Sequence, residues 1–341
     1  MTNYIGLDGH SGTCVFVVVN ESAEVINKVR IPTAEGALLR YIRGIKGQRK
    51  LVLEESHMSQ WLYLLFKDEV EELIVCNPLY LGKKQGAKDD FRDGLHLANE
   101  LRCGHLVAVY HEDSELWTLR SLAQAYLDVT RQLTQIKNRY KAVFRAQAIV
   151  TKGSTIFSDK GFIDKLPAGP ERFIATALFA QIEHLTIAKK SYLPEFERYA
   201  DKHRQIKRLC SVPGISLIRS TIITALVLSP TRFENKHKFW AYSMLVKYID
   251  KSDGAEYGKR NVYGRRELKA VFDGAALTVL KGDSALRKYY DRLRSNKIGH
   301  KSAKKAVARK IAAICLALLK GAGKYNDLYE VKRERLNRLS V

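Results

Sequence analysis

The sequence predicts an α/β N-terminal domain followed by an all-α remainder. Residues 1–112 alternate short strand-like runs with amphipathic stretches, whereas beyond residue 114 apolar residues recur at spacings of three and four. The charge changes at the same place, because residues 1–112 hold 13 Lys and Arg against 15 Asp and Glu, and the remainder holds 45 against 21. At 341 residues the chain is too long for one ordinary core. We therefore expect domains at 1–112, 113–200 and 201–341.

The first domain is expected to contain a mixed sheet. Three strand-like segments open the chain and are followed by alternating helices and strands. In order, the expected elements are strands at 4–8, 13–19 and 24–31, a helix at 33–45 with Thr33 as its N-cap, a strand at 51–55, a helix at about 58–66, a strand at 72–78 and a helix that ends near 101. Consecutive strands favour an antiparallel start, as in ribonuclease H-like folds, whereas a dinucleotide-binding domain begins β-α-β with a GxGxxG motif.

The middle region is expected to be a long helical arm. Between 116 and 147 the apolar residues follow one helix face, which is typical of an amphipathic helix or a coiled coil. The segment 151–162 is expected to be a loop. A second helix at about 169–191 then returns antiparallel to the first.

The last region, 201–341, is predicted to be a basic helical domain with 32 Lys and Arg against 12 Asp and Glu. Its stretch SVPGISLIRSTIITALVL (211–228) has a Pro-Gly turn before an apolar helix, which resembles a helix-hairpin-helix element whose backbone amides meet a DNA phosphate. Residues 250–269 are expected to form a polar, basic loop that runs into a helix. A chain with a pI of about 9.7 and this asymmetry favours a polyanionic partner, most commonly nucleic acid.

Composition also indicates the compartment. We expect no membrane span, no secretory signal and a cytoplasmic protein, bound to the nucleoid through its DNA. The five cysteines have no CxxC spacing and are expected to be reduced thiols of the core. They are Cys14, Cys76, Cys103, Cys210 and Cys315.

Acidic residues gather in KDDFRDGLHLA (88–98), at the start of a predicted helix. One interpretation is that Asp89 caps the helix while its neighbours offset the positive end of the helix dipole. The alternative is a metal site, since Asp90 and Asp93 share one helix face. Asp8 and Glu54 add carboxylates at the ends of the first and fourth strands, although each alone is also consistent with a turn residue or a solvated strand end.

Taken together, Asp8, Glu54, Asp90 and Asp93 predict a metal centre. Carboxylates at strand ends converge with carboxylates on a helix packed beside the sheet. Four such groups suit two Mg²⁺ ions, which prefer oxygen ligands and catalyse phosphodiester chemistry. Glu55 competes with Glu54 as the ligand, and Glu54 is preferred because it directly follows the apolar strand.

The chain resembles the transposases of insertion-sequence family one-ten, which include Piv-like DNA invertases and bridge-RNA-guided recombinases. The matching stretches cover nearly the whole chain in order: YIGLDGHSGTCVF, LVLEESHMSQWLYLLF, VCNPLYLGKKQGAKDDFRDGLHLANELRCGHL, SVPGISLIRSTIITA, FWAYSMLVKYIDKSDG and YGRRELKAVFDGAA. The resemblance implies a RuvC-like domain with the acids Asp8, Glu54, Asp90 and Asp93, a coiled-coil region, and a C-terminal domain with Ser252 as nucleophile. This chain departs from the family at two of these places. After the last Asp, where the family usually has Ala, it has Gly94, and Asp253 stands between the serine and the Gly that usually follows it directly.

The resemblance further implies a Mg²⁺-dependent recombinase that joins Ser252 covalently to DNA. Its partners would be donor and target DNA, a structured bridge RNA that selects both sites, and further copies of the chain in a dimer or tetramer. Four basic residues near the serine are expected to hold the phosphate backbone or to form a solvated basic face. These are Lys259, Arg260, Arg265 and Arg266.

Three other functions remain open from the sequence. The first is a Holliday-junction-type nuclease that uses the four acids and hydrolyses with water. The second is an actin-like kinase or ATPase, because LDGHSGTCVFVVV has the order of a first phosphate loop, although the second phosphate loop and the adenosine motif are absent. The third is a DNA-binding protein without catalysis.

Overall fold

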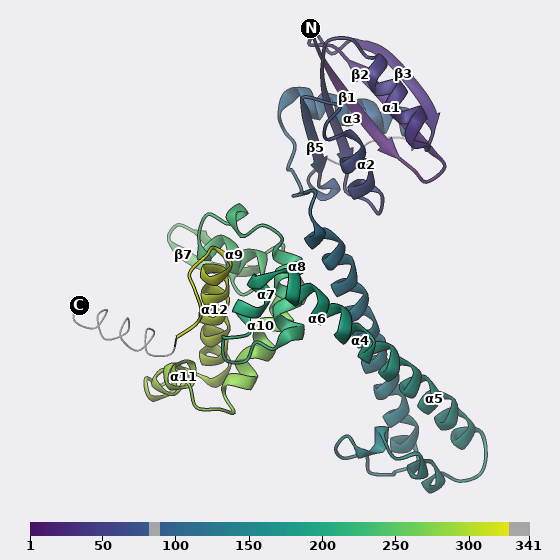
Figure 1. Ribbon diagram of the computed structural model, residues 1–341. Helices are drawn as coiled ribbons and strands as arrows, with labels where there is room; N and C mark the ends of the chain where they lie inside the picture. Colours follow the sequence, from purple (N-terminus) through teal and green to yellow (C-terminus); the bar gives the residue numbers. More distant parts are fainter. Residues whose placement is uncertain (82–88, 327–341) are drawn as a thin grey trace. The chain divides into compact units, whose positions relative to one another are not determined.

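The computed structural model describes residues 1–81 and 89–326 and divides into two compact units, Met1–Asp113 and Ser114–Val341 (Figure 1). Each unit buries apolar residues in cores of its own. The first unit is a layered α/β domain, and the second is mainly helical. Among the described residues, no helix is long and apolar enough to cross a membrane.

The first unit is built on a five-stranded mixed sheet of order β3-β2-β1-β4-β5. Its strands are β1 (Thr2–Gly9), β2 (Thr13–Val19), β3 (Val25–Pro32), β4 (Gln48–Glu54) and β5 (Glu72–Cys76). The first three pair antiparallel, whereas β4 is parallel to β1 and β5 is parallel to β4. The expected mixed sheet with an antiparallel start is therefore confirmed, and its order is consistent with a ribonuclease H-like domain.

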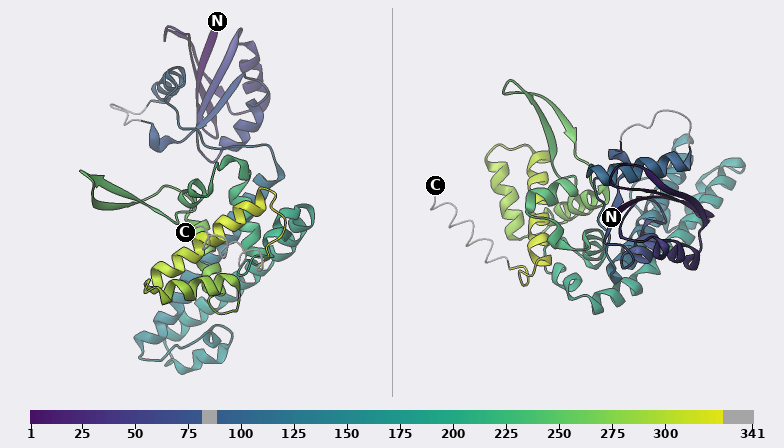
Figure 2. Two further views of the ribbon diagram at one scale, coloured as in Figure 1. Left: turned by 90° about the vertical axis from the view of Figure 1, so that its left-hand side faces the viewer. Right: turned by 90° about the horizontal axis from the view of Figure 1, so that it is seen from above.

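Helices cover both faces of this sheet (Figure 2). They are α1 (Glu35–Gly44), α2 (Ser59–Phe66) and α3 (Asp90–Cys103), and the short 3₁₀ helix η1 (Pro78–Tyr80) follows β5 with no buried residue. On one face, Leu7 and Leu53 of the sheet pack with Leu38 of α1 and Leu62 of α2. On the other face, Val52 of β4 packs with α3. Alternate strand residues thus belong to different layers, which decides the direction of the strand-end side chains.

The two predicted helix caps have different outcomes. Asp89 is the N-cap of α3, because its Oδ1 accepts a hydrogen bond from the backbone N–H of Phe91 at 3.1 Å. Thr33 is not the cap of α1, which begins one residue later with Ala34 in the N-cap position. The Thr33 hydroxyl instead donates to the carbonyl oxygen of His10 at 2.6 Å, and so ties the β1–β2 turn to the end of β3.

The second unit begins with two long helices that lie side by side, α4 (Glu115–Ala146) and α5 (Pro170–Lys190) (Figure 1). Tyr140 and Phe144 of α4 pack with Leu178 and Phe179 of α5. The segment between them was expected to be a loop, but it contains two 3₁₀ helices, η2 (Thr155–Phe157) and η3 (Lys160–Lys165). They form because Ile156 and Ile163 are buried against the helix pair.

A larger core joins the start of α4 to the later helices. Leu119 and Tyr126 of α4 share this core with Phe196, Phe272 and Ile311. The remaining elements of the unit are α6 (Tyr192–Lys202), α7 (Arg204–Leu209), α8 (Leu217–Val227), η4 (Pro230–Arg232), α9 (Lys236–Tyr242), β6 (Lys247–Ser252), β7 (Ala255–Asn261), α10 (Arg266–Val279), α11 (Ala285–Ser295) and α12 (His300–Leu319).

Two further expectations are wrong in part. The segment that was expected to be a loop before α10 is an antiparallel β-hairpin of β6 and β7, so the C-terminal region is not wholly helical. The cysteines are all free thiols, as expected, but only three of them are buried. Cys103 and Cys210 are exposed because they lie at the ends of α3 and α7, where the chain leaves the core.

Candidate active site

Asp8 and Glu54 lie side by side at the ends of two parallel strands. Leu7 of β1 is opposite Leu53 of β4, and the next residue on each strand is one of the two acids. Both leucines are buried in the core under α1 and α2. Because side chains alternate along a strand, Asp8 and Glu54 face the opposite layer, where α3 packs.

Helix α3 crosses this face at very short range. A Cβ atom added to Gly6 of β1 would lie 1.9 Å from the carbonyl oxygen of Gly94. Asp90 and Asp93 occupy the first turn of α3, just before this crossing. The close approach therefore brings the first turn of the helix toward the strand that ends in Asp8.

The electrostatics of Asp8 reflect the whole set of acids. Burial raises the pKa of the Asp8 carboxyl, the neighbouring His10 opposes that rise, and the negative charges of Asp90, Asp93 and Glu54 add to it. The four predicted residues thus gather at one end of the sheet, within one unit. Their role in binding a metal stays a prediction.

Two residues that the sequence analysis missed complete this cluster. His10, on the β1–β2 turn, places Nε2 3.3 Å from Oδ2 of Asp8 and 4.0 Å from Oδ1 of Asp90. Arg30, on the edge strand β3, places Nη2 2.8 Å from Oδ2 of Asp90. The only sequence signal for His10 was its position two residues after Asp8. Arg30 had none, because its proximity depends on the order of the strands.

Glu55 has a different environment from Glu54. The Oε2 atom of Glu55 lies 2.7 Å from Nε2 of His111, whose side chain is only 1% exposed. The other ring nitrogen of His111 is 2.7 Å from Oε1 of Gln60. This network links the end of the first unit to the start of α2 and holds the Glu55 carboxylate. The charge of Glu54 instead acts on Asp8, whose pKa it raises. The arrangement favours Glu54 over Glu55 as the fourth acid of the set.

The cluster suits a divalent cation. Ligand atoms of Asp8, His10 and Asp90 all lie within 4.8 Å of one another. The half-buried carboxylate of Asp8 has three acidic neighbours that raise its pKa, and a bound cation would remove that repulsion. The donor set contains mostly carboxylate oxygen, which Mg²⁺ and Mn²⁺ both accept.

Ser252 lies at the tip of the β6–β7 hairpin in the second unit. It pairs with Ala255 across a two-residue turn formed by Asp253 and Gly254. Both turn residues have positive φ, 50° and 76°, as a type I′ hairpin turn requires. Asp253 therefore completes an Asp-Gly turn, and the serine is exposed beside it.

The four predicted phosphate-binding residues have unequal surroundings. Arg260 is paired with Asp250, with 2.8 Å between Nε and Oδ1, and Lys259 lies 3.9 Å from a carboxylate oxygen of Glu256. Arg265 is the half-exposed N-cap residue of α10, and Arg266 is exposed in its first turn. Two of the four residues, Lys259 and Arg260, thus already lie next to acids of the same hairpin.

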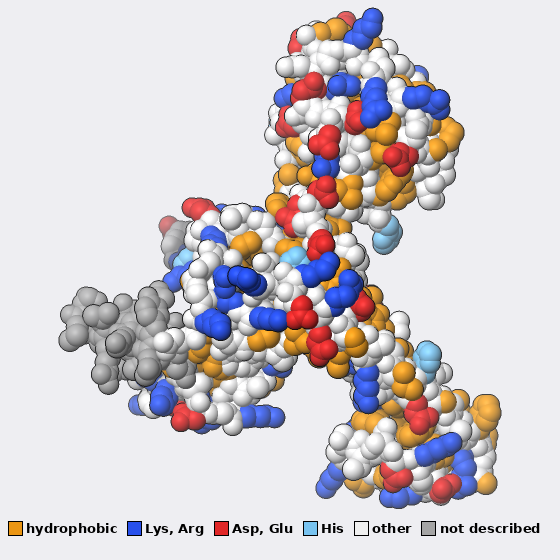
Figure 3. Space-filling view, viewed as in Figure 1, with side chains coloured by type: hydrophobic (Ala, Val, Ile, Leu, Met, Phe, Trp, Pro, Cys, Tyr) orange, Lys and Arg blue, Asp and Glu red, His pale blue; other side chains and the backbone are white. Residues whose placement is uncertain are grey.

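A stronger concentration of positive charge lies on α11 and α12. Residues 285–310 hold ten Lys and Arg against one Asp. Lys288, Arg294, Lys301 and Lys305 are exposed. The sequence analysis counted this charge only as part of the C-terminal total. On the face of the second unit that the space-filling view shows, basic side chains are spread rather than gathered in one place (Figure 3).

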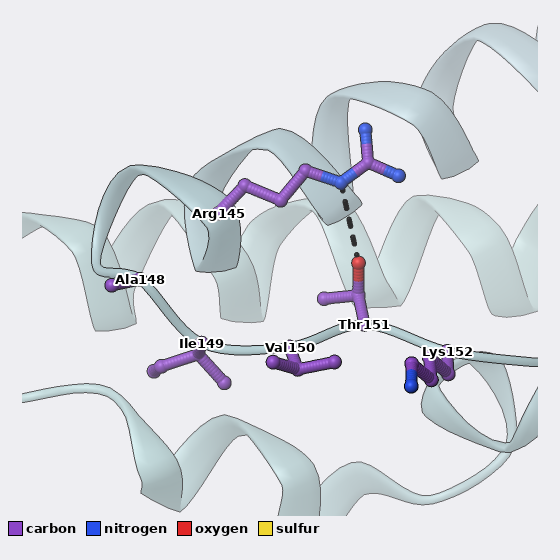
Figure 4. A pocket seen from close by; sticks show the side chains of 6 residues that line it. All are labelled: Arg145, Ala148, Ile149, Val150, Thr151 and Lys152. Atoms are coloured by element: carbon purple, nitrogen blue, oxygen red, sulfur yellow. Dashed lines mark hydrogen bonds between the residues drawn. The ribbon is translucent and has the colours of Figure 1, made fainter.

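A shallow pocket lies elsewhere in the second unit, at the end of α4 (Figure 4). Its lining residues are Arg145, Ala148, Ile149, Val150, Thr151 and Lys152. Arg145 Nε donates a hydrogen bond to Thr151 Oγ1 at 3.4 Å. None of the site residues predicted from the sequence lines this pocket, so we assign it no part in the site.

Comparison with protein families gives two matches. Residues 5–147 match a model of IS110-type DEDD transposases, and residues 206–291 match the model described as transposase, IS116/IS110/IS902 family. A comparison with curated proteins gave no match. The first match contains all four acids, and the second contains Ser252 and the basic residues beside it.

Proposed function

This chain belongs to the IS116/IS110/IS902 family of transposases, and we propose that it breaks and rejoins DNA strands with a metal centre in its first unit and a serine in its second. The observation that carries the proposal is the position of Asp8 and Glu54 at the ends of adjacent parallel strands, on the face that the first turn of α3 approaches with Asp90 and Asp93. Transposition requires phosphodiester chemistry, and convergent carboxylates are suited to it.

Asp8, Glu54, Asp90 and Asp93 would hold Mg²⁺, as two ions. Domains of this DEDD type use divalent metals. When bound, such ions activate a nucleophile and stabilise the oxygen that leaves phosphorus. The chain's own contribution is to fix four carboxylates on the strands β1 and β4 and on the first turn of α3.

Ser252 would be the nucleophile. Its hydroxyl oxygen forms a bond to a DNA phosphorus, the bond from that phosphorus to a deoxyribose oxygen breaks, and the hydroxyl proton ends on the oxygen that leaves. Exposure at a hairpin tip supports this role, because a two-residue turn leaves the hydroxyl accessible to a large substrate. Lys259, Arg260, Arg265 and Arg266 lie on or beside the same hairpin and would hold the backbone.

We infer the wider assembly from the resemblance described in the sequence analysis. A structured bridge RNA would select donor and target DNA, and a homodimer or homotetramer would hold both duplexes during strand exchange. We assign catalysis to residues 1–112, a coiled-coil arm to 113–200, and the serine-bearing domain with a helix-hairpin-helix-like element to 201–341. Its place of action is the cytoplasm, on nucleoid DNA.

One other function is favoured by a specific observation. All four acids belong to the first unit, whereas Ser252 belongs to the second. The same set therefore suits a Holliday-junction-type nuclease that uses water. Family membership does not support the actin-like kinase alternative.

Strand breakage tests the metal centre. The substrate is DNA that spans the junctions flanking the gene, together with RNA transcribed from those flanks. We expect cleavage that requires Mg²⁺, with a loss of about a hundredfold or more in Asp8→Asn and Asp90→Asn. Asp68→Asn is the matched control, because Asp68 is 81% exposed and lies outside the cluster. Cleavage at the parent rate by Asp8→Asn would contradict the proposal.

A further inference from the structure

The β1–β2 turn holds His10 in a fixed position beside the acids. The backbone N–H of His10 donates to the carbonyl oxygen of Thr13 at 3.1 Å, and its own carbonyl oxygen accepts from the Thr33 hydroxyl at 2.6 Å. Both hydrogen bonds anchor the backbone and leave the imidazole free to point at the cluster. Its Nε2 atom is 3.3 Å from Asp8 Oδ2.

Asp90 is oriented toward the same point. Arg30 binds its Oδ2 atom at 2.8 Å, and the other oxygen, Oδ1, is 4.0 Å from His10 Nε2. Arg30 also lies over the ring of Phe91, with 5.7 Å between the guanidinium carbon and the ring centroid. A carboxylate fixed by a second partner presents its remaining oxygen in a defined direction, which is how protein ligands are prepared for metals.

We propose that His10 is a metal ligand, and that Asp8, His10 and Asp90 form a mixed nitrogen–oxygen position that takes Mn²⁺ in preference to Mg²⁺. The proposal rests on the metal centre proposed above and adds a nitrogen donor that four carboxylates alone do not supply. Imidazole suits transition metals, whereas Mg²⁺ prefers oxygen. Glu54 and Asp93 supply only oxygen to the rest of the cluster.

A simpler role for His10 is a salt bridge, because a protonated imidazole would neutralise Asp8 and Asp90. The side chain of His10 is 49% exposed, so this alternative involves little burial of charge. The two roles differ in one observable property. A ligand nitrogen is bonded to the metal, whereas a protonated imidazole is repelled by it.

Pulsed electron paramagnetic resonance on the full chain with bound Mn²⁺ separates these roles. We expect a ¹⁴N coupling from a directly bonded nitrogen in the parent protein and its loss in His10→Ala, which still binds Mn²⁺ through the carboxylates. The matched control is His105→Ala. His105 is an exposed histidine of the same unit and lies 3.5 Å from one carboxylate oxygen, of Glu100. That variant is expected to keep the coupling.

Metal affinities give the second measurement. Titrations of the parent protein with MnCl₂ and MgCl₂ are expected to give a preference for Mn²⁺ of about tenfold or more, which His10→Ala removes by weakening Mn²⁺ selectively. Bound Mn²⁺ without a ¹⁴N coupling, or an unchanged preference in His10→Ala, would overturn the role of His10 and leave the four-acid centre intact. If the folded parent protein bound neither metal, both the ligand and the proposed function would fail. Circular dichroism checks that each variant is folded.

Discussion

Gly6 of β1 and Gly94 of α3 make the backbone contact that sets the distance between the acid-bearing strand and the acid-bearing helix. A Cβ at Gly6 would lie 1.9 Å from the Gly94 carbonyl oxygen and 2.8 Å from the backbone nitrogen of Ala98. Gly6 cannot accept a side-chain atom, because the obstacles are main-chain atoms. The position of Asp90 and Asp93 relative to Asp8 therefore depends on two residues that carry no functional group.

Gly6→Ala is expected to destabilise the first unit by about 3 kcal/mol or more, since the helix must move off the sheet. In whatever fraction stays folded, Mg²⁺ should no longer raise the melting temperature, because Asp90 and Asp93 move away from Asp8. Thermal melts with and without Mg²⁺ measure both effects. Gly36→Ala is the control, because no atom lies within 4 Å of its added Cβ. A Gly6→Ala protein with parent stability would show that this contact does not set the distance between β1 and α3.

Gly94→Ala should destabilise the first unit less than Gly6→Ala does. Its Cβ would lie 2.9 Å from Cγ2 of Val17, a side chain that can shift. We expect a loss of about 1–2 kcal/mol, partly offset by the better helix propensity of Ala. In a double-mutant cycle, Val17→Ala should offset part of this loss, so that the two changes are less than additive. Strict additivity in urea unfolding would contradict this packing argument.

Alkaline pH should destabilise the protein through two tyrosines, of which Tyr140 is buried and Tyr41 is partly buried. Burial raises the pKa of Tyr41 and of Tyr140 to about 12, from 10.0. Because the folded pKa lies above the unfolded one, the folded state holds more protons between these values, and stability falls as pH rises from 10 to 12. Below pH 10 both states are protonated and this contribution no longer varies with pH.

Phenylalanine variants test this assignment. Neither hydroxyl has a hydrogen-bond partner among the described residues, so Tyr41→Phe and Tyr140→Phe should keep parent stability at neutral pH or raise it by about 1 kcal/mol. Both should flatten the loss of stability above pH 10. Free energies of unfolding measured across this pH range give the slope of stability against pH. An unchanged slope in both variants would refute the assignment of this slope to the two tyrosines.

DNA affinity should depend more on α12 than on the hairpin. Lys301 and Lys305 are exposed in a segment with a single acid, whereas Lys259 and Arg260 lie beside Glu256 and Asp250. Replacing both lysines of α12 by Ala should reduce the slope of log affinity against log salt by about two. The matched pair Lys259→Ala and Arg260→Ala should reduce it by less than about one. The reverse order would place the main phosphate contacts on the hairpin.

The gathering of the acids was predictable because each lies where a local pattern ends. Asp8 and Glu54 follow apolar strand runs, and Asp89 caps the helix that carries the other two. Arg30 could not be found in this way. Its contact with Asp90 depends on β3 being an edge strand of the same sheet and on the face that α3 covers, which are both tertiary properties.

The hairpin was missed for a different reason. Nearly all of its residues are exposed, so it lacks the alternation of apolar and polar residues that identifies a half-buried strand. The signal that was present is the Asp253–Gly254 pair, which favours a two-residue hairpin turn. That pair is the one local feature from which the position of Ser252 at a hairpin tip follows.

Covalent capture of DNA at Ser252 tests the central claim most directly. The full chain is incubated with Mg²⁺, the flanking-junction DNA and its RNA, then denatured and digested for mass spectrometry. We predict a nucleotide adduct on the peptide that contains Ser252, and its absence in both Ser252→Ala and Asp8→Asn, while Ser252→Ala still binds metal and DNA. If Ser252→Ala cut DNA at the parent rate and no adduct formed, water would be the nucleophile and the four acids alone would carry the chemistry.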